Sequence, residues 1–130
     1  MCSICIIVIG CNRSTVGKVD LTYQNLTQIS HAYYEFTEKA SRPPTSWNDL
    51  KPHLTEFGDP AKIMISTNDN QEIVVYWNVQ VNPGTPIPVI AHEKSSTKGK
   101  RLVLEGKVIH ELTDEEFKKK PFPPGIKAPF

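Results

Sequence analysis

The chain has 130 residues, a formal net charge of +1 and a hydrophobic content of 38%. This size and composition predict one folded domain rather than a disordered chain. The near-neutral charge balance excludes the clustered basic surface that binding to nucleic acid requires. All three cysteines lie within the first eleven residues, so no disulfide framework is expected in the folded domain.

The N-terminus combines an apolar run, residues 3–10, with a cysteine that follows it directly, Cys11. An apolar run that ends in a small residue before a cysteine resembles the bacterial lipobox. This resemblance predicts that the mature chain begins at Cys11, carries acyl chains there and is anchored to a membrane, facing the periplasm or the exterior. Residues 1–20 would then be a signal, a lipobox and a polar tether.

Two other interpretations of this segment stay open. Residues 3–10 are rich in Ile and Val, so they can form the buried first strand of a small soluble cytosolic binding domain. The stretch from Gly10 to Lys18 also resembles a phosphate-binding loop. In that loop, however, four residues separate the glycines instead of six, and a hydroxyl stands where this chain has Val19.

The stretch from residue 25 to residue 40 carries large apolar residues three and four positions apart, which is typical of an amphipathic helix. We therefore predict a long helix over residues 21–40 with one buried stripe: Leu26, Ile29, Tyr33 and Phe36. Pro43 and Pro44 should end this helix, because proline lacks an N–H and restricts the residue before it. A short helical turn over residues 47–50 is expected next, with Trp47 packed under the long helix.

The rest of the chain reads as strands joined by short polar loops. Alternating or β-branched apolar residues predict five of them, at residues 61–67, 71–81, 88–93, 101–104 and 107–112. The first two should form a hairpin. Thr113 and Glu116 have capping-box spacing, so a short helix ending near Lys120 is expected, with Phe117 facing inward.

Together these elements predict an α+β domain over residues 21–120. One long N-terminal helix should pack on an antiparallel sheet of four to five strands. Residues 121–130 read as a proline-rich tail without a regular element.

Two segments, residues 25–34 (NLTQISHAYY) and 42–50 (RPPTSWNDL), resemble the globular part of the G-like pseudopilins of bacterial type II secretion. The ending LTDEEF at residues 112–117 is also similar to a branch of that family. The resemblance implies a pilin-like fold and a non-enzymatic role in the cell envelope, as a structural or protein-interaction module. The long apolar N-terminal helix of that family is expected to be missing, with a lipid on Cys11 as the anchor instead.

The four histidines lie on different predicted elements and lack metal-ligand spacing: His31, His53, His92 and His110. We predict no catalytic residues, metal site or cofactor from them. A small enzyme with a His/Glu site stays an alternative, because histidines distant in sequence can meet in the fold. His92 and Glu93 should face opposite sides of the sheet, as neighbours in a strand do.

Residues 66–70 form an oxygen-rich turn, and the pseudopilin resemblance raises the idea of a calcium loop there. Calcium takes six to eight oxygen ligands, often several of them carboxylates. Only Asp69 lies in the turn, with Glu72 nearby, so a simple Asx turn is the prediction. The predicted partners are thus a membrane and proteins of the envelope, and not nucleic acid.

Overall fold

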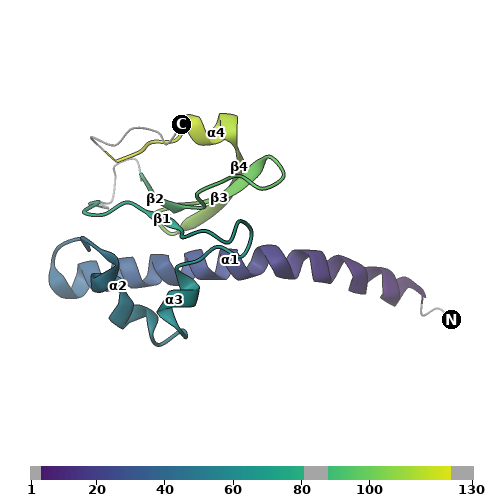
Figure 1. The fold of residues 1–130 in the computed structure, drawn as a ribbon, viewed down its shortest axis with the longest axis horizontal. Coiled ribbons are helices and arrows are strands. Elements are labelled where there is room, and N and C mark those ends of the chain that lie inside the picture. Colours follow the sequence, from purple (N-terminus) through teal and green to yellow (C-terminus); the bar gives the residue numbers. More distant parts are fainter. Residues whose placement is uncertain (1–3, 81–87, 124–130) are drawn as a thin grey trace.

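The computed structural model describes residues 4–80 and 88–123, with side chains from Leu21 onward. Within these residues, four helices and four strands follow one another (Figure 1). In order they are α1 (Ile4–Ala40), α2 (Trp47–Leu54), α3 (Pro60–Ile63), β1 (Val74–Val75), β2 (Val89–His92), β3 (Lys100–Glu105), β4 (Val108–Thr113) and α4 (Asp114–Lys118).

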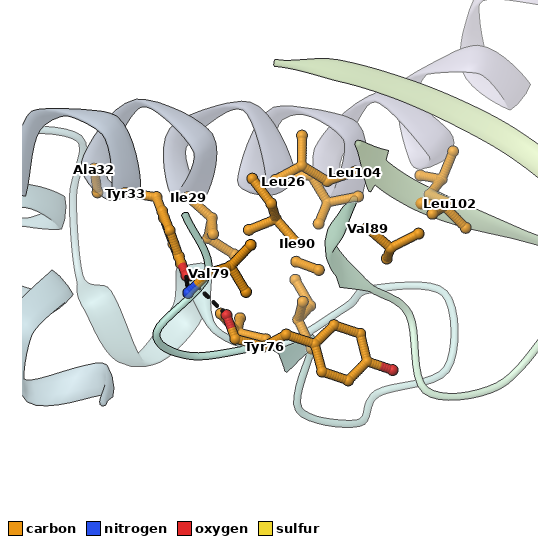
Figure 2. Packing of buried hydrophobic residues seen from close by; sticks show 14 of the residues in the cluster. Leu26, Ile29, Ala32, Tyr33, Tyr76, Val79, Val89, Ile90, Leu102 and Leu104 are labelled. Atoms are coloured by element: carbon orange, nitrogen blue, oxygen red, sulfur yellow. Dashed lines mark hydrogen bonds between the residues drawn. The ribbon is translucent and has the colours of Figure 1, made fainter. Parts of the chain in front are cut away.

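The strands form one antiparallel sheet in the order β1-β2-β3-β4. Helix α1 lies along one face of this sheet and α4 along the other, while α2 and α3 lie against α1 (Figure 1). Leu102 and Leu104 of β3 lie beneath α1 (Figure 2), whereas Arg101 of the same strand contacts Phe117 of α4. The predicted α+β architecture, a long helix packed on an antiparallel sheet, is therefore confirmed.

The buried stripe of α1 is confirmed at three of its four predicted positions. Leu26, Ile29 and Tyr33 are at most 1% exposed and pack in the core (Figure 2). Phe36 is only partly buried, so its assignment to the core was wrong. Its ring meets the edge of His53 from α2, and the Arg42 guanidinium lies 4.8 Å above it. Phe36 therefore packs at the end of α1 against α2 rather than under the sheet.

Residues 71–81 do not form the longest strand, as predicted. Within the described part of this segment, regular pairing is confined to Val74–Val75. Asn78 has a positive φ of 60°, which extended backbone does not adopt, and its N–H donates to Pro44 O of the α1–α2 connection. The backbone here leaves the sheet and turns toward α1.

The hydroxyl of Tyr33 holds this departing segment against α1. It donates to Tyr76 O at 2.9 Å and accepts from Val79 N at 3.1 Å (Figure 2). Burial raises the pKa of Tyr33 to about 12, so the hydroxyl keeps its proton at neutral pH.

We expect Tyr33→Phe to lower the free energy of unfolding by about 1–3 kcal/mol, because it leaves a buried carbonyl and a buried N–H without their partner. Urea denaturation monitored by circular dichroism measures this loss. Tyr23→Phe is the matched control, since Tyr23 is 46% exposed on the same helix. Equal stability of the two variants would show that the Tyr33 hydroxyl does not hold the segment.

Residues 61–67 do not form a strand either. Their first part lies in α3, where Asp59 is the N-cap and its side chain accepts from Ala61 N at 3.0 Å. Pro60 occupies the first helical position, for which its fixed φ is suited. The predicted hairpin is reduced to one bridge, between Ile65 and Glu72. A helix-start signal thus prevailed over the β-propensity of the apolar residues.

At the N-terminus, α1 begins at Ile4, so the alternative in which residues 3–10 form a buried first strand is wrong. The expected tether, residues 12–20, is part of the same helix. This part of α1 is not apolar throughout, because residues 12–20 (NRSTVGKVD) are mostly polar. Among the residues that the structure describes, no helix combines the length and the apolar character needed to cross a membrane.

The helical turn predicted over residues 47–50 is the first half of α2, and the predictions for the last three strands and the C-terminal helix fit the structure closely. β2, β3 and β4 match their predicted ranges to within two residues, and Gly106, with φ of 58°, makes the tight turn between β3 and β4. The capping box is present: Thr113 Oγ1 accepts from Glu116 N, and Glu116 Oε1 accepts from Thr113 N. Phe117 is fully buried, although α4 ends at Lys118 rather than near Lys120.

Candidate functional site

Cys11, the predicted lipidation residue, lies in α1 but outside the residues whose side chains the structure describes. The proline-rich tail lies partly outside the described residues as well. The other candidate groups all fall within them, and most belong to one of three clusters.

The first cluster joins two of the four histidines through one carboxylate, Glu35. His53 Nδ1 of α2 lies 2.6 Å from Glu35 Oε1, and His31 Nε2 lies 3.6 Å from Glu35 Oε2. Glu56 Oε1, in the turn after α2, also lies 3.4 Å from His31 Nε2. The packing of α2 against α1 thus brings together residues that the sequence separates by up to 25 positions.

The environment of this cluster keeps Glu35 ionised. The hydrogen bond from His53 is the main cause that holds the pKa of Glu35 below its ordinary value, and Lys39 adds to it. Beside His31 and Glu35 a groove of about 440 Å³ runs between α1 and the β3–β4 turn, where Lys107 lies. Among the described residues, this is the one place where three potential His, Cys, Asp or Glu ligand atoms for a metal ion come together.

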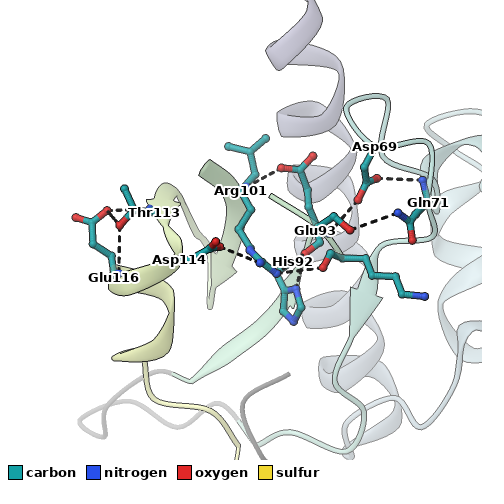
Figure 3. Close-up of polar contacts among 11 residues, drawn as sticks. Asp69, Gln71, His92, Glu93, Arg101, Thr113, Asp114 and Glu116 are labelled. Carbon is teal, nitrogen blue, oxygen red and sulfur yellow. Dashed lines mark hydrogen bonds and ion pairs between the residues drawn. The ribbon is translucent and has the colours of Figure 1, made fainter. Parts of the chain in front are cut away.

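The second cluster surrounds Glu93, which is 1% exposed (Figure 3). Its carboxylate accepts from Leu102 N at 2.7 Å, from Ser66 Oγ at 2.6 Å and from Asn68 Nδ2 at 2.8 Å. Thr22 of α1 lies 3.4 Å from Ser66 Oγ. These contacts join α1, the oxygen-rich turn and the sheet, and they give the buried charge the partners it requires.

The oxygen-rich turn itself is the predicted Asx turn. Asp69 Oδ1 accepts from Gln71 N and Asp69 Oδ2 accepts from Ser95 N, each at 3.0 Å (Figure 3). Both oxygens of the only carboxylate in the turn thus bind backbone N–H groups. This arrangement fixes the turn against the loop after β2, which is a structural role.

The third cluster lies on the opposite face of the sheet, as predicted for His92 relative to Glu93. His92 Nε2 lies 2.8 Å from the Tyr76 hydroxyl, and His92 Nδ1 lies 2.6 Å from Glu93 O. The ring packs edge-on against Phe117 at 4.7 Å. Burial lowers the pKa of His92 to about 4, so the ring is neutral at pH 7, donating from Nδ1 and accepting from Tyr76.

Arg101 completes this face (Figure 3). It is 7% exposed and donates to Lys94 O at 3.1 Å and to Asp114 Oδ1 at 3.0 Å, while its guanidinium lies 4.4 Å above the ring of Phe117. These contacts attach α4 to the sheet. The polar side chains of this cluster therefore bind groups of the same chain.

His110, the fourth histidine, is on β4 and faces Glu105 at 3.3 Å. Trp47, predicted to pack under the long helix, is partly buried against the core and packs edge-on against Trp77 at 5.4 Å. In comparisons with known proteins, no family model, no curated protein and no solved structure matches this chain.

Proposed function

We propose that this protein is a lipid-anchored, pseudopilin-like component of a bacterial cell envelope that acts as a structural or protein-interaction module rather than as an enzyme. The observation that carries the proposal is the course of α1. A single helix continues from the apolar N-terminal segment, through Cys11, into the body of the fold, where it lies across a four-stranded antiparallel sheet. A long N-terminal helix packed on an antiparallel sheet is the fold that the pseudopilin resemblance implies.

The buried polar groups support a non-enzymatic role. Glu93, Arg101 and His92 each bind groups from neighbouring elements of the same chain. Catalysis needs titratable groups that converge on a pocket open to a substrate. Groups that are engaged inside the fold instead stabilise the packing of α1 and α4 on the sheet.

The position of Cys11 suits an anchor. Leu21 lies ten positions after Cys11 in α1, so about 15 Å of helix lies between the two residues at 1.5 Å per residue. Acyl chains contribute about 0.8 kcal/mol for each buried methylene, so two or more chains hold a protein stably on a bilayer. A mature chain that begins at Cys11 would present the folded body just outside the membrane.

A second candidate function, a small enzyme with a His/Glu site, is favoured by one observation, the convergence of His31 and His53 on Glu35. The exposure of this cluster argues against it as an active site. His31 and Glu56 have side chains that are 53% and 54% exposed, so water reaches both. Such a site lacks the exclusion of water that strengthens electrostatic catalysis.

Fractionation of the full chain from a bacterial host tests the anchor. We expect the parent protein in the membrane fraction and Cys11→Ser in the soluble fraction, with the same melting temperature, because the proposal places residues 1–20 outside the folded body. Cys5→Ser is the matched control. It removes a thiol from the apolar run that precedes Cys11, residues 3–10, and should leave the protein in the membrane fraction. Membrane association of Cys11→Ser equal to that of the parent would refute the proposed anchor.

A further inference from the structure

Three potential metal ligands converge where α1 meets the turn after α2. They are His31 Nε2, one oxygen of Glu35 and one oxygen of Glu56, and all three atoms lie within 4.8 Å of one another. His31 and Glu35 stand four residues apart on α1, so they project from the same side of the helix. Glu56 approaches from the other segment and completes the group.

Two of the three separations are those expected between ligands of one cation. His31 Nε2 lies 3.4 Å from Glu56 Oε1 and 3.6 Å from Glu35 Oε2, beyond the ordinary N–H···O range of about 2.7–3.2 Å. A tetrahedral zinc ion holds N and O ligands at about 2.0–2.2 Å, which places neighbouring ligand atoms about 3.3–3.6 Å apart. Glu56 is half exposed and lies in a turn, so its carboxylate has the freedom to move into place as the third ligand.

Two of the three ligands are held in place by neighbours. His53 Nδ1 binds Glu35 Oε1 at 2.6 Å and leaves Oε2 directed toward His31. The ring of His31 packs edge-on against Phe57 at 5.3 Å. Hydrogen-bonded partners such as His53 orient the ligands of protein metal sites and are nearly as important as the ligands themselves. The groove beside His31 and Glu35 leaves room for water to complete the coordination.

We propose that His31, Glu35 and Glu56 bind a divalent transition-metal ion of the Zn²⁺ class, with His53 as the positioning residue for Glu35. Imidazole and carboxylate are ligands that Zn²⁺ accepts, and three protein ligands leave a position for water. An ion here would tie α1 to the end of α2. This inference is independent of the lipid anchor, because it uses no residue before His31.

Isothermal titration with Zn²⁺ tests the site. The protein used is the full chain with Cys2, Cys5 and Cys11 replaced by serine, so that thiols cannot bind the metal. We expect one Zn²⁺ per chain, loss of detectable binding in His31→Ala, and affinity weakened about 10- to 100-fold in His53→Ala. A rise in melting temperature with Zn²⁺ should accompany binding and should be absent from His31→Ala.

The matched control is His110→Ala, which removes another surface imidazole paired with a carboxylate at 3.3 Å and should bind Zn²⁺ like the parent. Glu56→Gln provides a second test at an exposed position, where folding is not at risk, and should weaken binding at least as much as His53→Ala. Absence of Zn²⁺ binding in the parent, or equal affinity in His31→Ala and His110→Ala, would overturn the proposal.

Discussion

Ile29→Asp should leave the chain unfolded at 25 °C. Ile29 is 0% exposed and belongs to the hydrophobic core cluster, so the substitution places a carboxylate among buried apolar residues. The cost of burying such a charge is several kcal/mol, which is a large part of the roughly 5–15 kcal/mol that stabilises a typical domain. Circular dichroism and thermal melting of the purified variant measure the effect.

Phe36→Asp is the matched control on the same helix, two turns further on. Phe36 is partly buried, and the Arg42 guanidinium lies 4.8 Å above its ring, where it can offset a new carboxylate. We expect this variant to fold with a lowered melting temperature. If Phe36→Asp unfolds and Ile29→Asp melts like the parent, the packing of α1 on the sheet is misassigned.

The second large effect is a loss of folding stability at acidic pH. His92 has its pKa lowered from 6.5 to about 4 by burial, so below pH 6.5 the unfolded chain takes up a proton that the folded chain does not. The contribution of His92 to the free energy of unfolding is therefore fully present above pH 6.5, and it decreases as the pH falls toward 4. At about 1.36 kcal/mol for each pKa unit, the loss reaches about 3 kcal/mol.

Urea denaturation at pH 7 and at pH 4.5 measures this dependence, and His92→Leu provides the comparison. The variant should be less stable at pH 7, because Tyr76 loses its hydrogen-bond acceptor, but it should lose less stability on acidification. Glu35 and Glu116 have lowered pKa values, so their contributions to stability are lost at lower pH, as they become protonated. An identical pH dependence in parent and variant would show that His92 is not the group responsible.

The elements predicted well from the sequence are those with local and redundant signals. The stripe of α1 repeats over several turns, the capping box fixes Thr113 and Glu116 at a set spacing, and Gly106 supplies the positive φ of its turn. Each signal depends on residues close in sequence, and so the prediction did not need the tertiary structure.

The errors arose where tertiary contacts or a stronger local signal prevailed. The alternation in residues 71–81 suggested a long strand, but contacts of Asn78 N–H with Pro44 and of Val79 N–H with Tyr33 draw this backbone away from the sheet. The pair Asp59-Pro60 is a helix-start signal that the strand prediction for residues 61–67 overlooked.

The grouping at Glu35 could be predicted only in part. The spacing of His31 and Glu35 places both on one side of α1, which was a usable signal. The contacts of His53 with Glu35 and of Glu56 with His31 depend on how α2 packs against α1, and no spacing in the sequence shows that packing.

The intact mass of the protein, purified in detergent from a bacterial membrane fraction, is the most direct test of the proposed anchor. The proposal predicts a chain that lacks residues 1–10 and carries the added mass of acyl chains on Cys11, with both features absent from Cys11→Ser. A membrane-bound protein with the unmodified mass of all 130 residues would contradict it.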